Sequence, residues 1–272
     1  MTGRSIVLPG FILVVLGMLA VVLVRKSGGE VASIRGSAMG THWTVEWRGD
    51  APEPVVLKRE ISATLEKWEQ VLSQWRPDSD LSRFNRGEPA TPELARVLEL
   101  ADGIKRKSGG AFDHHLLAEV HAAGFGPQGK GVDLSSIGKG FAVDRVCEHL
   151  GKLGMRDFVF ALAGEVRAVG RPWQVEIEKP LLAESVEDHV VMLENQAVAT
   201  SGNYRQFRET EEGLVTHIID PVTGKPVIRP PSSVTVIAAD CATASAWATA
   251  HFVLGPQYKG DLPELRVSWQ HP

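Results

Sequence analysis

The sequence predicts an α+β fold: a single domain with a mainly antiparallel sheet and flanking helices, preceded by an N-terminal membrane helix. Between residues 157 and 219, short β-rich runs are separated by turn residues, which is typical of an antiparallel meander. Helical patterns cluster outside this block, whereas a doubly wound sheet would alternate helices with strands. A long uncharged run precedes both. We therefore expect an anchor and linker over 1–30 and one domain over 31–272.

Four helices are predicted from the spacing of apolar residues. The first carries apolar residues at helical intervals, at Leu57, Ile61, Leu65, Trp68 and Leu72. The second begins near Thr91-Pro92 and ends before Gly109-Gly110. The third and fourth are expected over 141–153 and 242–254, with Gly138 and Gly140 at the mouth of the third.

Strands are predicted where β-rich or alternating runs are bounded by turn residues. They are expected over 42–47, 158–162, 166–170, 173–178, 189–193, 197–201, 214–219 and 234–238. A further run over 265–269 is expected to close the sheet.

The N-terminal run from Ile6 to Val24 contains 19 residues without a charge. A helix of that length is about 28 Å long, which is close to the apolar thickness of a bilayer. The run ends in Val-Leu-Val followed by Arg25 and Lys26, which is a poor signal-peptidase site, so we expect an uncleaved anchor. These two cations oppose a simple positive-inside arrangement with the domain outside, although a translocated domain can override that rule.

The composition is that of an ordinary globular protein. Apolar residues make up 43% and charged residues 23% of the chain, and the net charge is -4. Without a basic block, no nucleic-acid partner is expected. The two cysteines, Cys147 and Cys241, form no CxxC motif, so no structural zinc site is expected; the sequence leaves open whether they pair.

Several segments carry polar groups that suit a phosphate or a planar ligand. Asp133 opens a segment of small residues that continues with Lys139 into a helix, which can present N–H groups and a cation to phosphate. Taken alone, this glycine-rich entry is more often a tight turn, and Asp144 at its end is more often a surface charge. Phe112 beside Asp113 can stack on a heterocycle or simply close a loop.

Other polar residues follow the strands and the last helix. His217 and Asp220 lie in a segment that could line a cleft, although Asp-Pro-x-Thr-Gly is also good turn chemistry. Ser245 and Thr249 are four residues apart on one helix face and could reach a hard cation, or could simply pack. Arg205 could clamp a phosphate, although a solvated arginine is the better isolated interpretation.

Two adjacent histidines, His114 and His115, invite a metal interpretation. Neighbouring side chains on any regular element usually point apart. We therefore expect no metal site at this pair.

Taken in order, these motifs resemble the ApbE-type FAD:protein FMN transferase family. The matching stretches are SAMGTHWTVEW (37–47), SQWRPDSDLSRFN (73–85), GGAFD (109–113), DLSSIGKGFAVD (133–144), VATSGNYRQF (198–207), HIIDPVTGKPV (217–227) and SVTVIAADCATASAWATAHFVLG (233–255). The resemblance implies the single-lobed α+β fold of that family. It also implies an enzyme that binds FAD, splits its pyrophosphate with Mg²⁺ and attaches FMN through a phosphoester to a Thr or Ser of an extracytoplasmic redox protein.

The resemblance also implies roles for individual residues. It places the FAD contacts at Met39, Trp75, Ala111, Phe112, Asp113, Asp133, Lys139 and Ile219. It places the metal between Ser136, Ser245 and Thr249. His217 or Asp220 would orient the acceptor hydroxyl. With the anchor, it implies a single-pass protein of the cell inner membrane whose catalytic domain faces the periplasm.

The sequence departs from the family pattern at three places. The family's helix motif has an aspartate where this chain has Ser245. At a second place, the family usually carries a paired glycine where this chain has Ala163-Gly164. The link between Phe125 and Val132 is shorter than is usual in the family. Two alternatives therefore stay open: a non-catalytic FAD-binding protein, and a Mg²⁺-dependent FAD pyrophosphatase that releases FMN and AMP.

Overall fold

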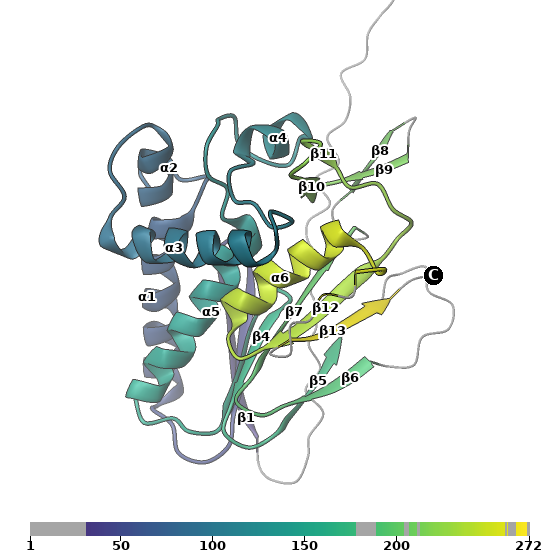
Figure 1. The fold of residues 1–272 in the computed structure, drawn as a ribbon. Coiled ribbons are helices and arrows are strands. Elements are labelled where there is room, and N and C mark those ends of the chain that lie inside the picture. Colours follow the sequence, from purple (N-terminus) through teal and green to yellow (C-terminus); the bar gives the residue numbers. More distant parts are fainter. Residues whose placement is uncertain are drawn as a thin grey trace, which may run out of the picture.

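A seven-stranded antiparallel sheet forms the centre of the protein (Figure 1). The structure is a computed structural model that describes residues 31–177, 189–203, 207–210, 213–258, 260 and 265–270. The strand order is β1-β2-β3-β4-β7-β12-β13, and every neighbouring pair is antiparallel. These strands are β1 Ala32–Ala38, β2 Thr41–Trp47, β3 Phe158–Leu162, β4 Glu165–Val169, β7 Ala197–Gly202, β12 Ser233–Ala238 and β13 Arg266–Gln270. The predicted α+β class with a mainly antiparallel sheet is confirmed.

The prediction of one continuous meander is wrong. Strand β4 pairs directly with β7, and the strands between them, β5 (Trp173–Ile177) and β6 (His189–Leu193), form a separate two-stranded sheet. Trp173 and Leu193 are buried against Val159 and Val198 on one face of the large sheet. Because this pair covers that face, it cannot also extend the sheet sideways.

Two further pairs of short strands lie beyond the large sheet. One joins β8 (Phe207–Thr210) to β9 (Gly213–Thr216), and the other joins β10 (Ile219–Asp220) to β11 (Lys225–Pro226). The run expected over 214–219 is therefore divided between β9 and β10.

Helices cover the other face of the sheet (Figure 1). The helices are α1 Pro54–Leu72, α2 Asp80–Asn85, α3 Pro92–Lys107, α4 Leu117–Ala122, α5 Ser135–Lys152 and α6 Cys241–Leu254, of which α1, α5 and α6 pack directly on the large sheet. In β3, Phe158 and Phe160 face the helices, whereas Val159 and Ala161 face the β5–β6 pair. This alternation explains why all of β3 is buried.

Three of the predicted helices, now α1, α3 and α6, are confirmed, but α5 begins at Ser135 instead of Phe141. Gly138 and Gly140 consequently lie inside its first turns. A Cβ at Gly140 would overlap the Cys241 carbonyl, so this glycine lets α5 and α6 approach closely. Strand β1 and the short helices α2 and α4 were not predicted.

Some expectations concern residues outside the described ranges. They include the N-terminal segment 1–30 and Arg205. Among the helices that the structure describes, none has the length and apolarity needed to cross a membrane. Cys147 and Cys241 are both buried and free.

Candidate functional site

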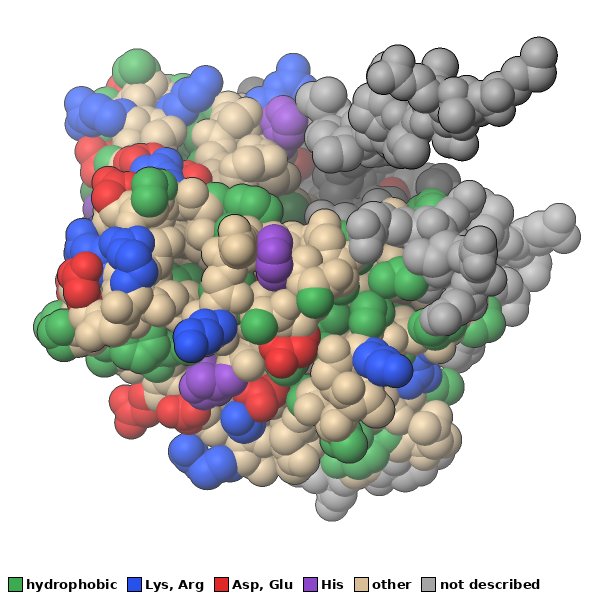
Figure 2. Space-filling view, turned by 90° about the horizontal axis from the view of Figure 1, so that it is seen from above, with side chains coloured by type: hydrophobic (Ala, Val, Ile, Leu, Met, Phe, Trp, Pro, Cys, Tyr) green, Lys and Arg blue, Asp and Glu red, His purple; other side chains and the backbone are tan. Residues whose placement is uncertain are grey.

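A cavity of about 440 Å³ lies between the sheet, α5, α6 and β5. Its lining comes from segments far apart in the sequence: the β1–β2 turn, the segment after α1, the first turns of α5, the β3–β4 turn, β7 and α6. Figure 2 shows the molecule from above Figure 1; on this face, Lys and Arg side chains lie in separate groups, with Asp and Glu side chains between some of them. The cavity is large enough to accept a small-molecule ligand.

The structure brings seven of the predicted site residues together around this cavity. They are Met39, Trp75, Ser136, Lys139, His217, Ser245 and Thr249. The other six are outside its lining: Ala111, Phe112, Asp113, Asp133, Ile219 and Asp220.

One wall of the cavity is rich in hydroxyl groups. The Thr249 hydroxyl lies 3.2 Å from that of Ser201 on β7, and it donates to the Ser245 carbonyl over 3.4 Å. The three residues therefore present neighbouring neutral oxygen atoms from β7 and α6. The sequence motifs assigned no role to Ser201.

The first turns of α5 form a second wall. Ser135 and Ser136 line the cavity at the helix N-terminus, and Lys139 follows one turn later. The Lys139 ammonium lies 3.9 Å from a carboxylate oxygen of Glu165. A helix N-terminus next to a lysine favours a phosphate group, because both the exposed N–H groups and the cation attract negative charge.

Asp133 lies just before α5 and is buried. Its Oδ1 accepts a 2.7 Å hydrogen bond from the Ser135 backbone N–H, while its Oδ2 has no hydrogen-bond partner among the described residues. Burial raises the pKa of Asp133, against the opposing effect of this hydrogen bond. The carboxylate therefore fixes the entrance to α5 and keeps one acceptor oxygen unused.

His217 and Asp220 have different environments. His217 lines the cavity, with its ring edge-on to Phe125 at a centroid distance of 6.0 Å. Asp220 accepts hydrogen bonds from the Val222 N–H at 2.9 Å and the Thr223 hydroxyl at 3.2 Å. Both Asp220 oxygens thus stabilise a turn, which was the alternative interpretation of this motif. Neighbouring Ile219 is buried in a small apolar cluster with Val120.

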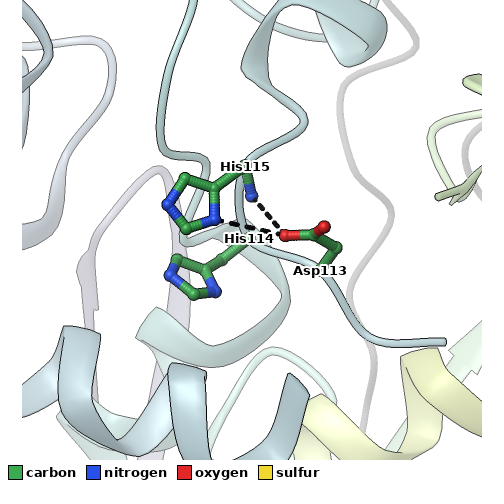
Figure 3. Close-up of side chains that lie close together, drawn as sticks. All are labelled: Asp113, His114 and His115. Atoms are coloured by element: carbon green, nitrogen blue, oxygen red, sulfur yellow. Dashed lines mark hydrogen bonds and ion pairs between the residues drawn. The ribbon is translucent and has the colours of Figure 1, made fainter. Parts of the chain in front are cut away.

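The segment 111–115 is a loop beside α3. Ala111 and Phe112 are buried in the main core. Asp113 accepts from the His115 N–H at 2.9 Å and pairs with the Lys105 ammonium at 2.8 Å. The expectation that His114 and His115 point apart is wrong, because the segment is not part of a regular element and their ring centroids are only 4.2 Å apart (Figure 3).

Asp144 was expected to be a surface charge, and this is also wrong. It is 2% exposed, accepts hydrogen bonds from the N–H groups of Cys241 and Ala242, each at 2.9 Å, and forms an ion pair with Arg167. Burial raises the pKa of Asp144, and Arg167 opposes that shift. Asp144 therefore holds the N-terminus of α6, the helix that carries Ser245 and Thr249. Its position four residues after Gly140, on the same helix face, is the signal that could have revealed its burial.

The β3–β4 turn contains one of the departures from the family pattern. Ala163 has a φ of 56°, in the left-handed region, and Gly164 follows it in the cavity lining. The Ala163 N–H donates to the His42 carbonyl over 3.1 Å, which holds the turn against β2. A glycine would adopt this φ with less steric cost.

Comparison with known proteins gives consistent matches across the domain. The chain is 29% identical over 279 residues to the FAD:protein FMN transferase of Escherichia coli (strain K12), which covers 84% of this chain and 80% of that protein. It is 32% identical over 281 residues to the FAD:protein FMN transferase of Haemophilus influenzae, and the match covers 83% of this chain and 81% of that protein.

Solved structures agree. The flavin transferase ApbE from Vibrio cholerae superposes with a TM-score of 0.75 at 29% identity, covering 85% of this chain and 89% of that chain. The apo flavinyl transferase ApbE of Pseudomonas stutzeri superposes with a TM-score of 0.75 at 31% identity, and the match covers 84% of this chain and 86% of that chain. The model of the ApbE family matches residues 39–131 and 126–266. This chain belongs to the ApbE family.

Proposed function

We propose that this protein is an FAD:protein FMN transferase that modifies a Thr or Ser of an extracytoplasmic redox protein. One observation carries the proposal: a phosphate-binding feature, the α5 N-terminus with Lys139, faces the same cavity as the hydroxyl wall of Ser201, Ser245 and Thr249. The family and the named activity of the relatives support this assignment.

FAD would bind with its pyrophosphate near Lys139 and the first turn of α5. The Trp75 side chain is 64% exposed at the cavity, so its ring is available to stack on a planar heterocycle, and Met39 lines the same cavity. Asp133 would contribute indirectly, because its hydrogen bond to the Ser135 N–H holds the N-terminus of α5 in place. The predicted contacts of Ala111, Phe112, Asp113 and Ile219 with FAD stay predictions, because these residues lie outside the cavity lining.

The cavity offers oxygen atoms, which are the ligands that Mg²⁺ prefers. This cation binds oxygen ligands and is usually held by one or two carboxylates together with substrate phosphates and water. Ser136, Ser245 and Thr249 would hold it through oxygen atoms, with Ser201 as an added neighbour. Bound there, Mg²⁺ would neutralise charge on the pyrophosphate. Because these ligands are neutral, the phosphates must supply much of the negative charge.

The residues of the chain would mainly position the reactants, which is the principal requirement of phosphoryl transfer. The acceptor hydroxyl oxygen forms a bond to the FMN phosphorus, and the bond from that phosphorus to the bridging oxygen breaks, so that AMP leaves. His217 lines the cavity and would orient the hydroxyl and receive its proton. Asp220, whose oxygens are engaged in the turn, would instead shape the segment that carries His217.

The same proposal includes the cellular arrangement. Residues 1–30 would form an uncleaved single-pass anchor in the cell inner membrane, and the flavin transferase domain over 31–272 would face the periplasm. The uncharged run from Ile6 to Val24 supports this arrangement. Expression of 31–272 without the anchor should give a soluble, FAD-binding protein; recovery only in detergent would contradict it.

The transferase can be tested with the full-length protein in detergent, FAD, Mg²⁺ and an acceptor domain that carries a candidate Thr. Mass spectrometry should show FMN on that Thr, with AMP released in equal amount. A matched acceptor with Ala in place of the Thr should stay unmodified. Release of FMN and AMP without modification would support a pyrophosphatase, and bound but intact FAD would support the binding-protein alternative, which Ser245 favours.

A further inference from the structure

A second group of possible ligand atoms lies in the loop after α3, outside the cavity lining. One ligand atom from each of Asp113, His114 and His115 lies within 4.8 Å of the other two. Figure 3 shows both imidazole rings on one side of the loop, with the Asp113 carboxylate beside them. Of the three, only Asp113 is also a predicted FAD contact, and all three lie outside the cavity lining.

The two ring nitrogens of His114 have different surroundings. Its Nε2 lies 3.5 Å from an Asp102 carboxylate oxygen, while its Nδ1 is buried and has no hydrogen-bond partner among the described residues. The His114 side chain is 1% exposed. A carboxylate beside one nitrogen favours the proton there and leaves a lone pair on the other, as is usual for metal-binding histidines. A buried nitrogen without a partner is otherwise costly.

The other two residues are already spaced like ligands of one cation. His115 Nδ1 lies 3.3 Å from Asp113 Oδ1, within hydrogen-bond distance, so a bound cation would take the place of the shared proton. Two ligands bound to one zinc ion at about 2.0–2.1 Å in tetrahedral geometry lie roughly 3.4 Å apart. The His115 side chain is half exposed, so a cation could enter from solvent.

Lys105 leaves this arrangement intact. Its ammonium contacts Oδ2 of Asp113 at 2.8 Å, whereas the contact with His115 is made by Oδ1. Lys105 thereby fixes the carboxylate in place, although its positive charge also weakens the binding of a second cation.

We propose that Asp113, His114 and His115 form a site for a transition-metal ion of the zinc class, with Asp102 orienting His114. Two imidazoles and one carboxylate favour Zn²⁺, Co²⁺ or Cu²⁺ over Mg²⁺, which prefers oxygen ligands alone. Water would complete the coordination on the exposed side. The site is distinct from the hydroxyl wall and does not depend on transferase activity.

The test is a Zn²⁺ titration of the full-length protein, without FAD or Mg²⁺, in competition with a chromophoric chelator. We expect one Zn²⁺ per chain and little displacement by excess Mg²⁺. His115→Ala removes a ligand and should therefore weaken binding by more than the about 10- to 100-fold typical of losing a residue that only orients a ligand. Co²⁺ should give the visible absorption of a low-symmetry, nitrogen-containing site, and His115→Ala should abolish that spectrum.

His149→Ala is the matched control. His149 also lies beside a carboxylate, that of Glu60 at 3.1 Å, but it is not one of the three proposed ligands. It should bind Zn²⁺ like the wild type. Asp102→Asn should weaken binding less than His115→Ala and should leave the stoichiometry at one. Absence of Zn²⁺ binding by the wild type, or unchanged binding by His115→Ala, overturns the proposal.

Discussion

Two regions of the molecule can attract a cation, and they do so by opposite means. The hydroxyl wall of Ser201, Ser245 and Thr249 offers neutral oxygens in a cavity. The loop with Asp113 and His115 offers a carboxylate and imidazole nitrogens next to Lys105. A cation on the hydroxyl wall therefore depends on charge brought by a phosphate ligand, whereas a cation in the loop is held by the protein itself.

The largest effect is expected from Asp144, because it holds the helix that forms the hydroxyl wall. Asp144→Asn removes the partner of Arg167 in a buried ion pair and weakens the acceptor for the Cys241 and Ala242 N–H groups. We expect the free energy of unfolding, measured with urea, to fall by about 3 kcal/mol. Asp78→Asn, at an exposed position, is the control and should cost little. An equally small loss in both variants would show that α6 is held by packing alone.

The next largest effect concerns the charge of the hydroxyl wall. Ser245→Asp introduces a carboxylate one helical turn before Thr249 and should tighten Mg²⁺ binding by about tenfold or more, because a full charge attracts a hard cation better than a hydroxyl does. Calorimetric titration with and without FAD measures this change. The wild type should bind Mg²⁺ mainly when FAD is present.

Ser245→Asn is the control for Ser245→Asp, since it has nearly the same size without the charge. It should leave Mg²⁺ binding unchanged. If wild type and Ser245→Asp bind Mg²⁺ equally well, the comparison between a neutral and a charged region fails, and another carboxylate supplies the site. Asp240, which caps α6 by accepting from the Thr243 N–H at 2.8 Å, would be examined first.

A substitution of Lys139 can show whether the cavity binds the phosphate groups of FAD. We expect the protein to bind FAD more tightly than riboflavin, and Lys139→Met to weaken FAD binding by about tenfold with little change for riboflavin. Fluorescence titration of both ligands measures the difference. Lys67→Met, at an exposed lysine paired with Glu93 on the helical side, is the control. Equal losses for FAD and riboflavin would place Lys139 near the ring instead of the phosphates.

The sequence predicted periodic elements well and long-range pairing poorly. Apolar spacing located α1, α3 and α6 because each buries one continuous face or, for α6, nearly every side. The pairing of β4 with β7 could not be predicted, since the β5–β6 strands between them are as β-rich as the strands of the large sheet. Burial of Trp173 beneath the sheet decides that arrangement.

The candidate site was predicted through ordered motifs more than through chemistry. Those motifs identified seven residues that now line one cavity, among them Ser136 and Lys139. They did not reveal Ser201 as a neighbour of Thr249, because the contact joins β7 to α6. They also missed the contact between His114 and His115, because the rule that neighbouring side chains point apart holds for helices and strands but not for this loop.

The smallest effect is expected at Glu46, a partly buried carboxylate of β2 that belongs to neither cation-attracting region. Burial raises the pKa of Glu46, so its charged form is disfavoured in the folded state. The unfolded chain then binds fewer protons than the folded one in this range, and stability falls slightly as pH rises through the raised pKa. Glu46→Gln should therefore raise the free energy of unfolding at about pH 7 by less than about 0.5 kcal/mol.

This gain should vanish at about pH 3 and below, where Glu46 is protonated in both the folded and the unfolded state. Urea unfolding at several pH values measures it, and Glu99→Gln at an exposed site of α3 serves as the control. A gain that persists unchanged in acid would trace the effect to packing of the amide. A gain confined to neutral pH would show that burial of the Glu46 carboxylate, which has no ion pair among the described residues, lowers stability. Asp113 avoids much of that cost, because its contact with Lys105 helps to lower its pKa although burial acts to raise it.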